Sequence, residues 1–535
     1  MGSPSDAPSA VGTPATNPEA ESPGSRPRGR RRGRNRPAEG ERRIEQPPFR
    51  RHRRWFEPTR AVSDDQLEAI HHASLRVLAE TGIDVLNAEA RRLLAAEGAT
   101  VVDDQRVRFD PEMVIEHVAK APSEFTMRAR NPEHSVTLGG DHVVFSAVAS
   151  PPNVSDVPGG RRTGNRADYQ NLLRLTQHLN AIQINGGYPV EPADVHASVR
   201  HLHALDDAVT LTDKVPKCYS LGAERNRDGL EIARIANGLT PDEVDQNTIV
   251  STVINTSSPL RLDDPMAQGI IEFAARNQAL IITPFTLAGA MAPVTIPGAV
   301  TQQNAEALAA ISLAQIVRPG APVVYGGFTS NVDMKSGSPA FGTPEFIQSA
   351  MLGGQLARRY GLPYRSSNVN AANAVDAQAG YESVFSLWGA VMGGANLVFH
   401  GAGWLEGGLR ASFEKMVVDA DLINMVATFL TPLVVDDATL ALEAIAEVGP
   451  GGHFFGVQHT QDRYRDAFFA PMVSDWRNFE SWEEAGSPTA EQKATDLVGS
   501  LLGEYERPPM DDAIRAELDD FVARRVAEGG VATDY

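Results

Sequence analysis

Residues 322–366 decide the fold, and they read PVVYGGFTSNVDMKSGSPAFGTPEFIQSAMLGGQLARRYGLPYRS. A short apolar run, 322–326, leads into a loop rich in Gly, Ser and Asn, and a helical pattern follows. Thr343 is a suitable helix cap, Pro344 suits the first helical position, and the Gly-Leu-Pro of 361–363 ends the helix. A second short apolar run begins at that proline. The stretch therefore predicts one strand–helix–strand unit of a parallel sheet.

The same unit repeats through the middle of the chain. Eight short apolar runs alternate with Ala- and Leu-rich helical patterns over roughly 280 residues, which is the spacing typical of a barrel of alternating strands and helices. The runs are His142–Ala147, Ala181–Asn185, Val209–Asp213, Thr248–Asn255, Leu280–Phe285, Pro322–Gly326, Pro363–Ser366 and Asn396–His400. We predict an α/β fold, a (β/α)8 TIM barrel with N-terminal and C-terminal helical extensions. A doubly wound open sheet is the alternative.

Composition divides the chain into four parts. We expect a disordered Arg-rich tail at 1–54, a helical or mixed extension at 55–140, the TIM barrel at 141–410 and a C-terminal helical extension at 411–535. The tail holds 13 arginines against six acidic residues, a net +7, so the rest of a chain of charge -19 carries -26. An acidic body disfavours nucleic acid. Only the tail is a candidate for binding RNA or a phosphate surface.

Several function classes lack their usual signatures. Cys218 is the one cysteine, which excludes an intramolecular disulfide and a cysteine-rich metal site and favours a reducing cytoplasm. No phosphate-binding, dinucleotide-binding or serine-hydrolase glycine motif occurs. The uncharged stretch 279–300 contains three prolines, so we expect a strand and loop there and not a membrane span. His201 and His203 have too few partners to predict a metal site, and Lys217 is a weak candidate for a Schiff-base lysine.

Polar chemistry gathers on the loops that follow the last three predicted strands. These loops, 327–337, 366–373 and 400–408, supply amides, hydroxyls, a histidine and a carboxylate. The carboxyl ends of barrel strands are where such folds build their active sites. Trp404 lies between glycines on the third loop, where its ring could face a ligand cation.

Several longer motifs resemble the trimethylamine:corrinoid methyltransferase family, in the same order along residues 55–530. They are QQNAE at Gln302–Glu306, DAQAGYE at Asp376–Glu382, GAGWLEGG at Gly401–Gly408 and EVGPGGHF at Glu447–Phe454. The resemblance implies a TIM barrel that moves a methyl group from an amine to the Co(I) of a separate corrinoid protein. The cobalamin then belongs to that partner, and this chain binds no cofactor or metal of its own.

The chain departs from the trimethylamine enzymes of the family in one respect. Those enzymes use pyrrolysine near the seventh-strand loop, where this chain has only standard residues, among them Asn368, Asn370 and Asn373. Family members without pyrrolysine act on quaternary amines, so the resemblance favours glycine betaine or a related betaine. Trimethylamine or a sulfonium such as dimethylsulfoniopropionate is the alternative donor. A non-catalytic betaine-binding protein or RNA-associated scaffold is the alternative class.

The resemblance and the chemistry together assign candidate site residues. Trp404, with Phe328 and Phe285, is expected to hold the ammonium group. The substrate carboxylate is expected on His400, Asn368, Asn370 or Arg365. Three further residues, Asp376, Tyr381 and Glu406, are expected to shape the pocket. We also expect a cytoplasmic homo-oligomer without membrane contact.

Overall fold

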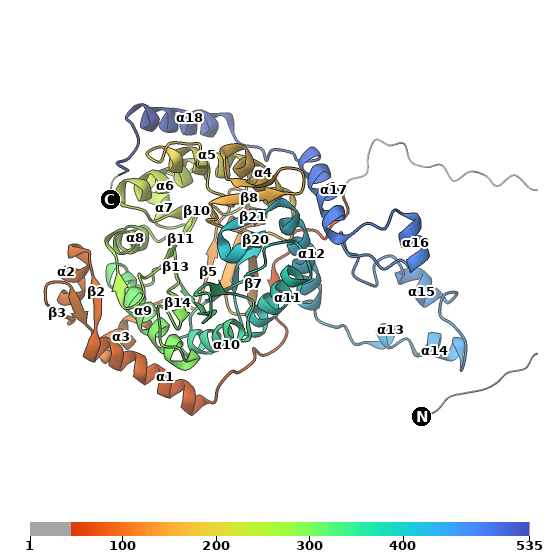
Figure 1. Cartoon of the computed structure of the whole chain (residues 1–535), viewed down its shortest axis with the longest axis horizontal. Coiled ribbons are helices and arrows are strands. Elements are labelled where there is room, and N and C mark those ends of the chain that lie inside the picture. The colour runs from red at the N-terminus through yellow and green to blue at the C-terminus, as the bar shows by residue number, and fades with distance from the viewer. Residues whose placement is uncertain (1–43, 534–535) are drawn as a thin grey trace, which may run out of the picture. The chain divides into compact units, whose positions relative to one another are not determined.

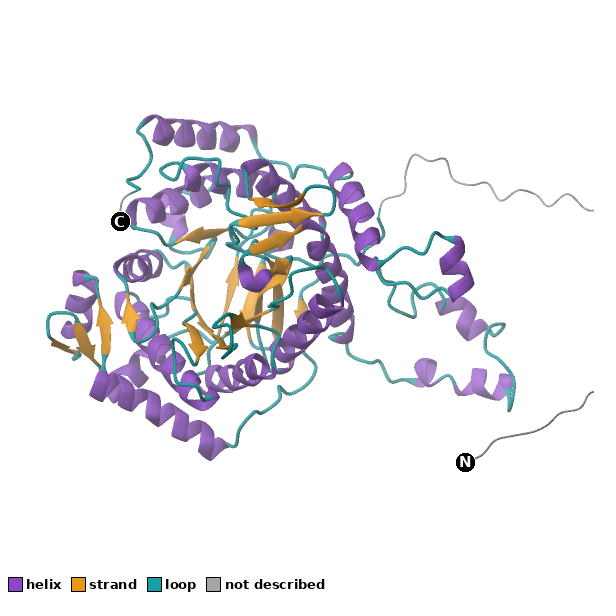
Figure 2. Ribbon diagram, in the orientation of Figure 1, coloured by secondary structure: helices purple, strands orange, loops and turns teal. Residues whose placement is uncertain are grey.

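The computed structural model describes residues 44–533, and its centre is a curled eight-stranded sheet surrounded by helices (Figures 1 and 2). The order across the sheet is β1-β7-β19-β18-β15-β13-β11-β10. All neighbours pair in parallel except β1, which runs antiparallel to β7. The strands are β1 (His52–Arg53), β7 (His142–Ala147), β10 (Lys217–Tyr219), β11 (Ser251–Ile254), β13 (Ala279–Ile282), β15 (Val323–Gly326), β18 (Tyr364–Ser367) and β19 (Leu397–Ala402).

Residues 183–185 lie between β7 and the segment that directly precedes β10. The Gln183 amide donates to the Phe145 carbonyl at 2.8 Å, and the Asn185 amide donates to the Val215 carbonyl at 3.1 Å. Ile184 forms isolated parallel bridges on both sides. The run predicted at 181–185 therefore contributes single bridges and no regular strand.

Six of the predicted runs coincide with β7, β11, β13, β15, β18 and β19, which confirms an α/β fold built on a parallel sheet. The strand predicted at Val209–Asp213 is wrong. Most of that run is the end of α5 (Arg200–Leu211), and the strand begins later, at Lys217. Leu202, Leu205 and Val209 are buried at intervals of three and four residues, the spacing of a helix face.

Helices cover the outside of the sheet and connect its parallel strands (Figure 1). Side chains cap two of them, and the cap predicted at Thr343 is confirmed. Thr343 accepts a hydrogen bond from the Phe346 amide at 3.3 Å, and Asp376 accepts one from the Gln378 amide at 2.9 Å. The helices, in addition to α5, are α4 (Arg166–His178), α6 (Ala223–Ala236), α7 (Pro241–Val244), α8 (Asp264–Ala275), α9 (Ile296–Val317), α10 (Pro344–Arg359), α11 (Ala377–Met392) and α12 (Phe413–Phe429).

Three small sheets and one hairpin accompany the main sheet. Two of these sheets lie on segments that follow its strands, so they place further side chains near its carboxyl edge. The strands are β14 (Phe285–Ala288), β16 (Phe328–Val332) and β17 (Pro339–Ala340) in one, and β8 (Asn153–Asp156), β9 (Gly160–Thr163), β20 (Trp404–Leu405) and β21 (Arg410–Ser412) in the other. The remainder are β2 (Ile83–Val85), β3 (Thr100–Val102), β4 (Arg106–Arg108) and β12 (Arg261–Leu262), and the hairpin β5 (Glu124–Met127) with β6 (Val136–Gly139).

The N-terminal flank packs against the helical ring, with α1 and α3 both against α9. Residues 44–54, predicted to belong to a disordered tail, lie against the sheet through β1 and through Arg54, which donates to the Ala395 carbonyl at 2.9 Å. The rest of that predicted tail falls outside the described residues. The helices of this flank are α1 (Asp64–Arg76), α2 (Ala88–Ala96) and α3 (Pro111–Val118), with a π-helical turn at Val77–Thr81.

The C-terminal flank contains helices that differ in how they pack. Helices α17 (Ala490–Gly503) and α18 (Asp512–Ala527) lie against the ring, whereas four short helices stand apart from it (Figure 1). These four are α13 (Asp437–Leu440), α14 (Leu442–Val448), α15 (Gln458–Arg463) and α16 (Phe479–Glu484). Among the described helices, none has both the length and the apolar character needed to cross a membrane.

Candidate active site

A cavity of about 410 Å³ lies at the carboxyl ends of the parallel strands. Its walls come from β10, β18 and β19 of the main sheet and from β14, β16 and β20 beyond it. Strands that alternate with helices bring their carboxyl ends to one edge, so residues far apart in sequence meet there. The cavity therefore occupies the place where the sequence predicts an active site.

One wall of the cavity is aromatic. The ring centroids of Phe328 and Trp404 lie 6.2 Å apart, those of Phe341 and Trp404 lie 6.2 Å apart at nearly a right angle, and Phe285 lies 5.2 Å from Phe328. Faces of such rings carry partial negative charge and attract cations. This wall can hold a methylated ammonium group without any carboxylate.

The indole of Trp404 is held in one orientation. Its Nε1 donates to the Asn370 carbonyl at 3.1 Å, and the Asn370 side chain donates back to the Trp404 carbonyl at 2.9 Å. Gly408 has a positive φ of 98°, and a Cβ built there would lie 2.6 Å from the indole ring. Only glycine allows the backbone to approach the ring so closely.

Two cationic side chains face the same cavity without an acidic partner. The Arg365 side chain is buried, and its Nε and Nη1 have no hydrogen-bond partner among the described residues. Lys217 Nζ lies 4.3 Å from the centroid of the Tyr219 ring and 5.2 Å from that of Phe399, and the Arg365 guanidinium lies 5.1 Å from Phe399. No carboxylate among residues 44–533 forms an ion pair with either cation. Buried polar groups are normally paired, so this pair of cations indicates an anionic ligand group.

Burial changes the protonation of these groups. It lowers the pKa of Lys217 to about 7, with the charge of Arg365 adding to the effect, and it lowers the pKa of Arg365 to about 9. Burial, followed by the charges of Arg365 and Lys217, holds the pKa of His400 well below its usual range. The Ala149 amide donates to His400 Nδ1 at 3.3 Å, so the neutral ring carries its proton on Nε2. A neutral imidazole beside Trp404 does not repel a cationic substrate.

Five of the predicted substrate-binding residues line this cavity: Phe285, Phe328, Arg365, His400 and Trp404. The other two, Asn368 and Asn370, lie behind the wall. Asn368 donates to the Gly401 carbonyl at 2.8 Å, and Asn370 is bonded to Trp404 as described above. Both asparagines hold the backbone that carries His400 and Trp404.

The three residues expected to shape the pocket lie outside its lining. Asp376 caps α11. Tyr381 lies on the same helix with its side chain 62% exposed. Glu406 forms ion pairs with Arg161 and Arg410, both at 3.1 Å, and so connects the loop that follows β19 to the β8–β9 hairpin.

The lining residues that were not predicted in this role include Lys217, Phe341 and Phe399. The sequence pattern offers Lys217 only as a weak Schiff-base candidate, because it places the third strand at 209–213, too early in the chain. Phe399 directly precedes His400 on a predicted strand, so its place near the carboxyl end of that strand could have identified it as a lining residue. Phe341 lies in a loop whose path the sequence does not specify.

The two histidines considered for a metal site do not lie in a metal-binding cluster. His201 Nε2 lies 2.8 Å from Asp228. Within the described part of the chain, no group of three or more His, Cys, Asp or Glu side chains comes together in a way that could hold a metal ion.

Comparison with known proteins identifies the family. The trimethylamine methyltransferase (MTTB) family profile matches residues 26–530. A glycine betaine methyltransferase of Desulfitobacterium hafniense strain Y51 is 36% identical over 470 residues, covering 88% of this chain and 98% of the relative. The trimethylamine methyltransferase MttB of strain DCB-2 of that species is 30% identical over 475 residues, covering 88% and 95%.

Among solved structures, the monomethylamine methyltransferase MtmB of Methanosarcina barkeri aligns with a TM-score of 0.45 and 11% identity, covering 84% of this chain and 90% of that one. The two sequence relatives cover a similar share of this chain at 30–36% identity. This chain belongs to the trimethylamine methyltransferase family.

Proposed function

We propose that this protein transfers a methyl group from a zwitterionic quaternary amine, glycine betaine or a related betaine, to the Co(I) of a separate corrinoid protein. One observation carries the choice of substrate. The unpaired cations Arg365 and Lys217 share a cavity with the aromatic wall around Trp404. A betaine offers a carboxylate to the cations and a trimethylammonium group to the rings.

Electrostatics favours this class over an amine without an anionic group. A buried charge without a counterion costs several kcal/mol, and a carboxylate that accepts two guanidinium hydrogen bonds offsets that cost. Protonated trimethylamine or tetramethylammonium would bring a third positive charge beside Arg365 and Lys217 and leave both unpaired. The relative named as a glycine betaine methyltransferase supports the same class.

The reaction needs little from the protein beyond binding and alignment. The N–CH3 bond breaks, its electron pair stays on nitrogen, and the methyl carbon bonds to the acceptor cobalt, so betaine leaves as a neutral tertiary amine. The quaternary nitrogen is already an activated leaving group and requires no general acid. The aromatic wall orients the N–CH3 axis and excludes water, and the cations fix the opposite end of the substrate.

The cobalamin in this proposal is carried by the partner protein, which must reach the cavity from the carboxyl edge of the sheet. Leu409 at this rim is 57% exposed, so the lining extends to the surface. We further infer that the sheet closes as a (β/α)8 barrel. The backbone hydrogen bonds from 183–185 to β7 and to Val215, just before β10, support this closure.

A donor panel tests the function. The protein is incubated with Co(I) corrinoid and with glycine betaine, dimethylsulfoniopropionate, trimethylamine or tetramethylammonium, while methyl-Co(III) absorbance is followed. We expect methyl transfer from glycine betaine, and kcat/KM at least 100-fold lower for the two donors without a carboxylate, because these leave buried cations unpaired. Activity with trimethylamine alone would overturn the proposal. A preference for the sulfonium would change the proposed substrate to dimethylsulfoniopropionate, which also bears a carboxylate.

The Arg365→Met variant tests directly whether the unpaired cations bind the substrate carboxylate. The hydrogen-bonded charge pair contributes about 2–3 kcal/mol, so its loss should raise the KM for glycine betaine roughly 30- to 150-fold. Arg60→Met, which removes an exposed arginine, is the matched control and should leave KM unchanged. Tight betaine binding without turnover in the wild-type protein would favour the non-catalytic alternative.

A further inference from the structure

The outer face of α11 carries an apolar stripe that nothing in the described chain covers. Tyr381, Val384, Phe385 and Trp388 follow one another at helical spacing, and each is 41–62% exposed. The opposite face of the same helix is buried against the ring through residues such as Leu387 and Val391. A helix that is apolar on both faces is normally buried on both.

The stripe continues onto neighbouring elements. Trp388 lies 5.2 Å from Phe429 at the end of α12, and Phe429 lies 6.0 Å from Trp55. Trp55 Nε1 donates to the Phe429 carbonyl at 3.0 Å. Met425, one turn before Phe429, is 44% exposed. These side chains together with the α11 stripe form one surface, here called the α11–α12 face.

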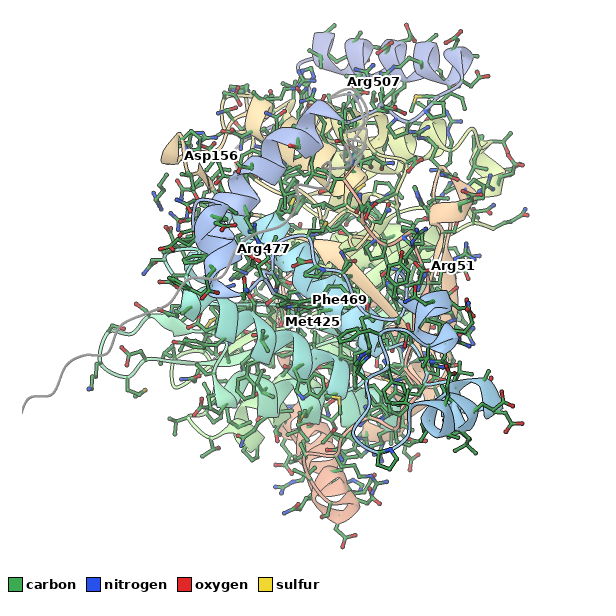
Figure 3. The ribbon with its side chains drawn as sticks, turned by 90° about the vertical axis from the view of Figure 1, so that its right-hand side faces the viewer. Arg51, Asp156, Met425, Phe469, Arg477 and Arg507 are labelled. Atoms are coloured by element: carbon green, nitrogen blue, oxygen red, sulfur yellow. The ribbon has the colours of Figure 1, made fainter. Side chains whose placement is uncertain are left out.

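A second apolar surface begins where this face ends. After Phe429 the chain departs from the ring and returns at 472–474, where three backbone amides donate to Asp421 of α12 at 2.8–3.4 Å. The excursion 431–471, here called the arm, holds the short helices α13, α14 and α15. Figure 1 shows these helices standing away from the ring, and Figure 3 views this side of the molecule, with Met425 of the α11–α12 face and Phe469 of the arm labelled.

The arm exposes more large apolar side chains than an isolated segment can sustain. Leu433, Val435, Phe455 and Phe468 are 76–88% exposed. Its helices have four to seven residues, and helices of that length are unstable in water without tertiary packing. The arm therefore requires a surface to lie on.

The scale of the exposed surface indicates a protein partner. Nineteen of the 26 exposed large apolar side chains among the described residues belong to the α11–α12 face or to residues 431–479. At roughly 100 Å² for each half-exposed side chain, they present well over 1,000 Å², beyond the 300–600 Å² of the largest patch on a typical monomer. Stable interfaces bury about 800 Å² on each partner.

We propose that the partner is a second copy of this chain, with the arm of one copy packed on the α11–α12 face of the other. Both surfaces lie on one chain, so a two-fold dimer buries the arm and the α11–α12 face of both copies. Charge agrees with this pairing. Residues 431–489 contain ten acidic and three basic residues, whereas residues 44–60, around Trp55, contain five arginines and two glutamates. A corrinoid protein must instead face the cavity at the carboxyl edge of the sheet, and the outward side of α11 does not line that cavity.

Molar mass in solution gives the first test, by light scattering on the full chain at about 20 µM. We expect the wild-type protein to have at least twice the mass of one chain. The double variants Val384→Glu/Trp388→Glu and Phe455→Glu/Phe468→Glu should each halve it. Ile115→Glu places the same charge at an exposed apolar helix position, 49% exposed, outside both surfaces and should keep the wild-type mass. Circular dichroism verifies folding of every variant.

Cysteine cross-linking identifies the occupant. The single native thiol, Cys218, is buried and does not compete. Two proteins, one with Trp388→Cys and one with Phe455→Cys, are mixed, left to exchange subunits and then oxidised. A covalent dimer formed in the mixture, and not within either protein alone, supports the proposal. A monomeric wild-type protein overturns the proposal. An internal disulfide in the dilute double-cysteine chain also overturns it, and so does an α11–α12 face that becomes protected from solvent only when a corrinoid protein is added.

Discussion

At the scale of single residues, Lys217 contributes most to the character of the cavity. It lies beside Arg365 and Phe399, it is buried, and it has no acidic partner among the described residues. Burial places its pKa at about 7, so it changes charge near neutral pH. An anion binds the protonated form and raises that pKa again.

Betaine affinity should therefore depend on pH. Below pH 7 Lys217 is charged before the ligand arrives, whereas above pH 7 binding must first take up a proton. We expect the Kd for glycine betaine, measured by titration calorimetry without the corrinoid protein, to rise between pH 6.5 and 8.5, with a limiting slope of tenfold per pH unit.

The Lys217→Arg variant provides the control, because arginine stays protonated across this range. Its Kd should be nearly independent of pH, and Lys217→Met should bind weakly at every pH. A wild-type Kd that does not change from pH 6.5 to 8.5 would remove Lys217 from the anion site.

Five of the seven predicted substrate-binding residues reach the cavity because each lies in, or shortly after, a strand whose apolar run is visible in the sequence. Lys217 was not predicted to line the cavity because its strand is not visible in the sequence. The apolar run 209–213 belongs mostly to a helix, and the real strand, Lys217–Tyr219, is too short and too mixed in composition to stand out. Asn368 and Asn370 follow a strand too, but their amides turn back to the backbone.

At the scale of elements, the segment from β19 to β21 sets the position of the aromatic wall. Buried groups hold it from behind: Asp419 of α12 accepts a hydrogen bond from the Gly403 amide at 2.9 Å and pairs with Lys415 at 2.5 Å. Lys415 also donates to Ser383 of α11 at 2.8 Å. Two outer helices thus fix the loop that carries Trp404.

Close packing of this loop makes Gly408 critical. In Gly408→Ala the new methyl group would lie 2.6 Å from the Trp404 indole, so the ring must shift out of the wall. We expect glycine betaine affinity to fall at least tenfold, because cation–π contacts of about 0.5–2 kcal/mol and the alignment of the substrate are lost together. Equilibrium binding measures the change.

Gly337→Ala separates the ring shift from backbone strain. Gly337 also has a positive φ, 75°, but no atom lies within 4 Å of the position that a Cβ would take there. Both variants carry the penalty of about 1 kcal/mol for a side chain in this region of backbone space. Equal loss of affinity in the two variants would contradict a specific role for Gly408.

At the scale of the whole molecule, the site is contained in one compact unit. Contacts group residues Ile44–Tyr535 into one unit. Every residue that lines the cavity lies between Ala149 and Leu409. The described lining therefore needs no residue from the arginine-rich segment 1–43.

Removal of residues 1–43 should leave methyl transfer from glycine betaine unchanged within about twofold. The measurement compares kcat/KM of the truncated and full-length proteins with the same corrinoid protein, and the melting temperature of each serves as the folding control. A large rise in KM for the corrinoid protein alone would assign the arginine-rich part to partner binding.

The amino-acid sequence by itself determined the class of fold, six of the strands, the helix cap at Thr343, and the edge of the sheet at which the cavity lies. These features depend on local periodicity and on capping chemistry, which neighbouring residues specify. Only the tertiary structure decided that Arg365 and Lys217 share a cavity without a counterion, and that α11 and the arm remain uncovered. Pairing and burial depend on which segments meet in space, and no short stretch of sequence contains that information.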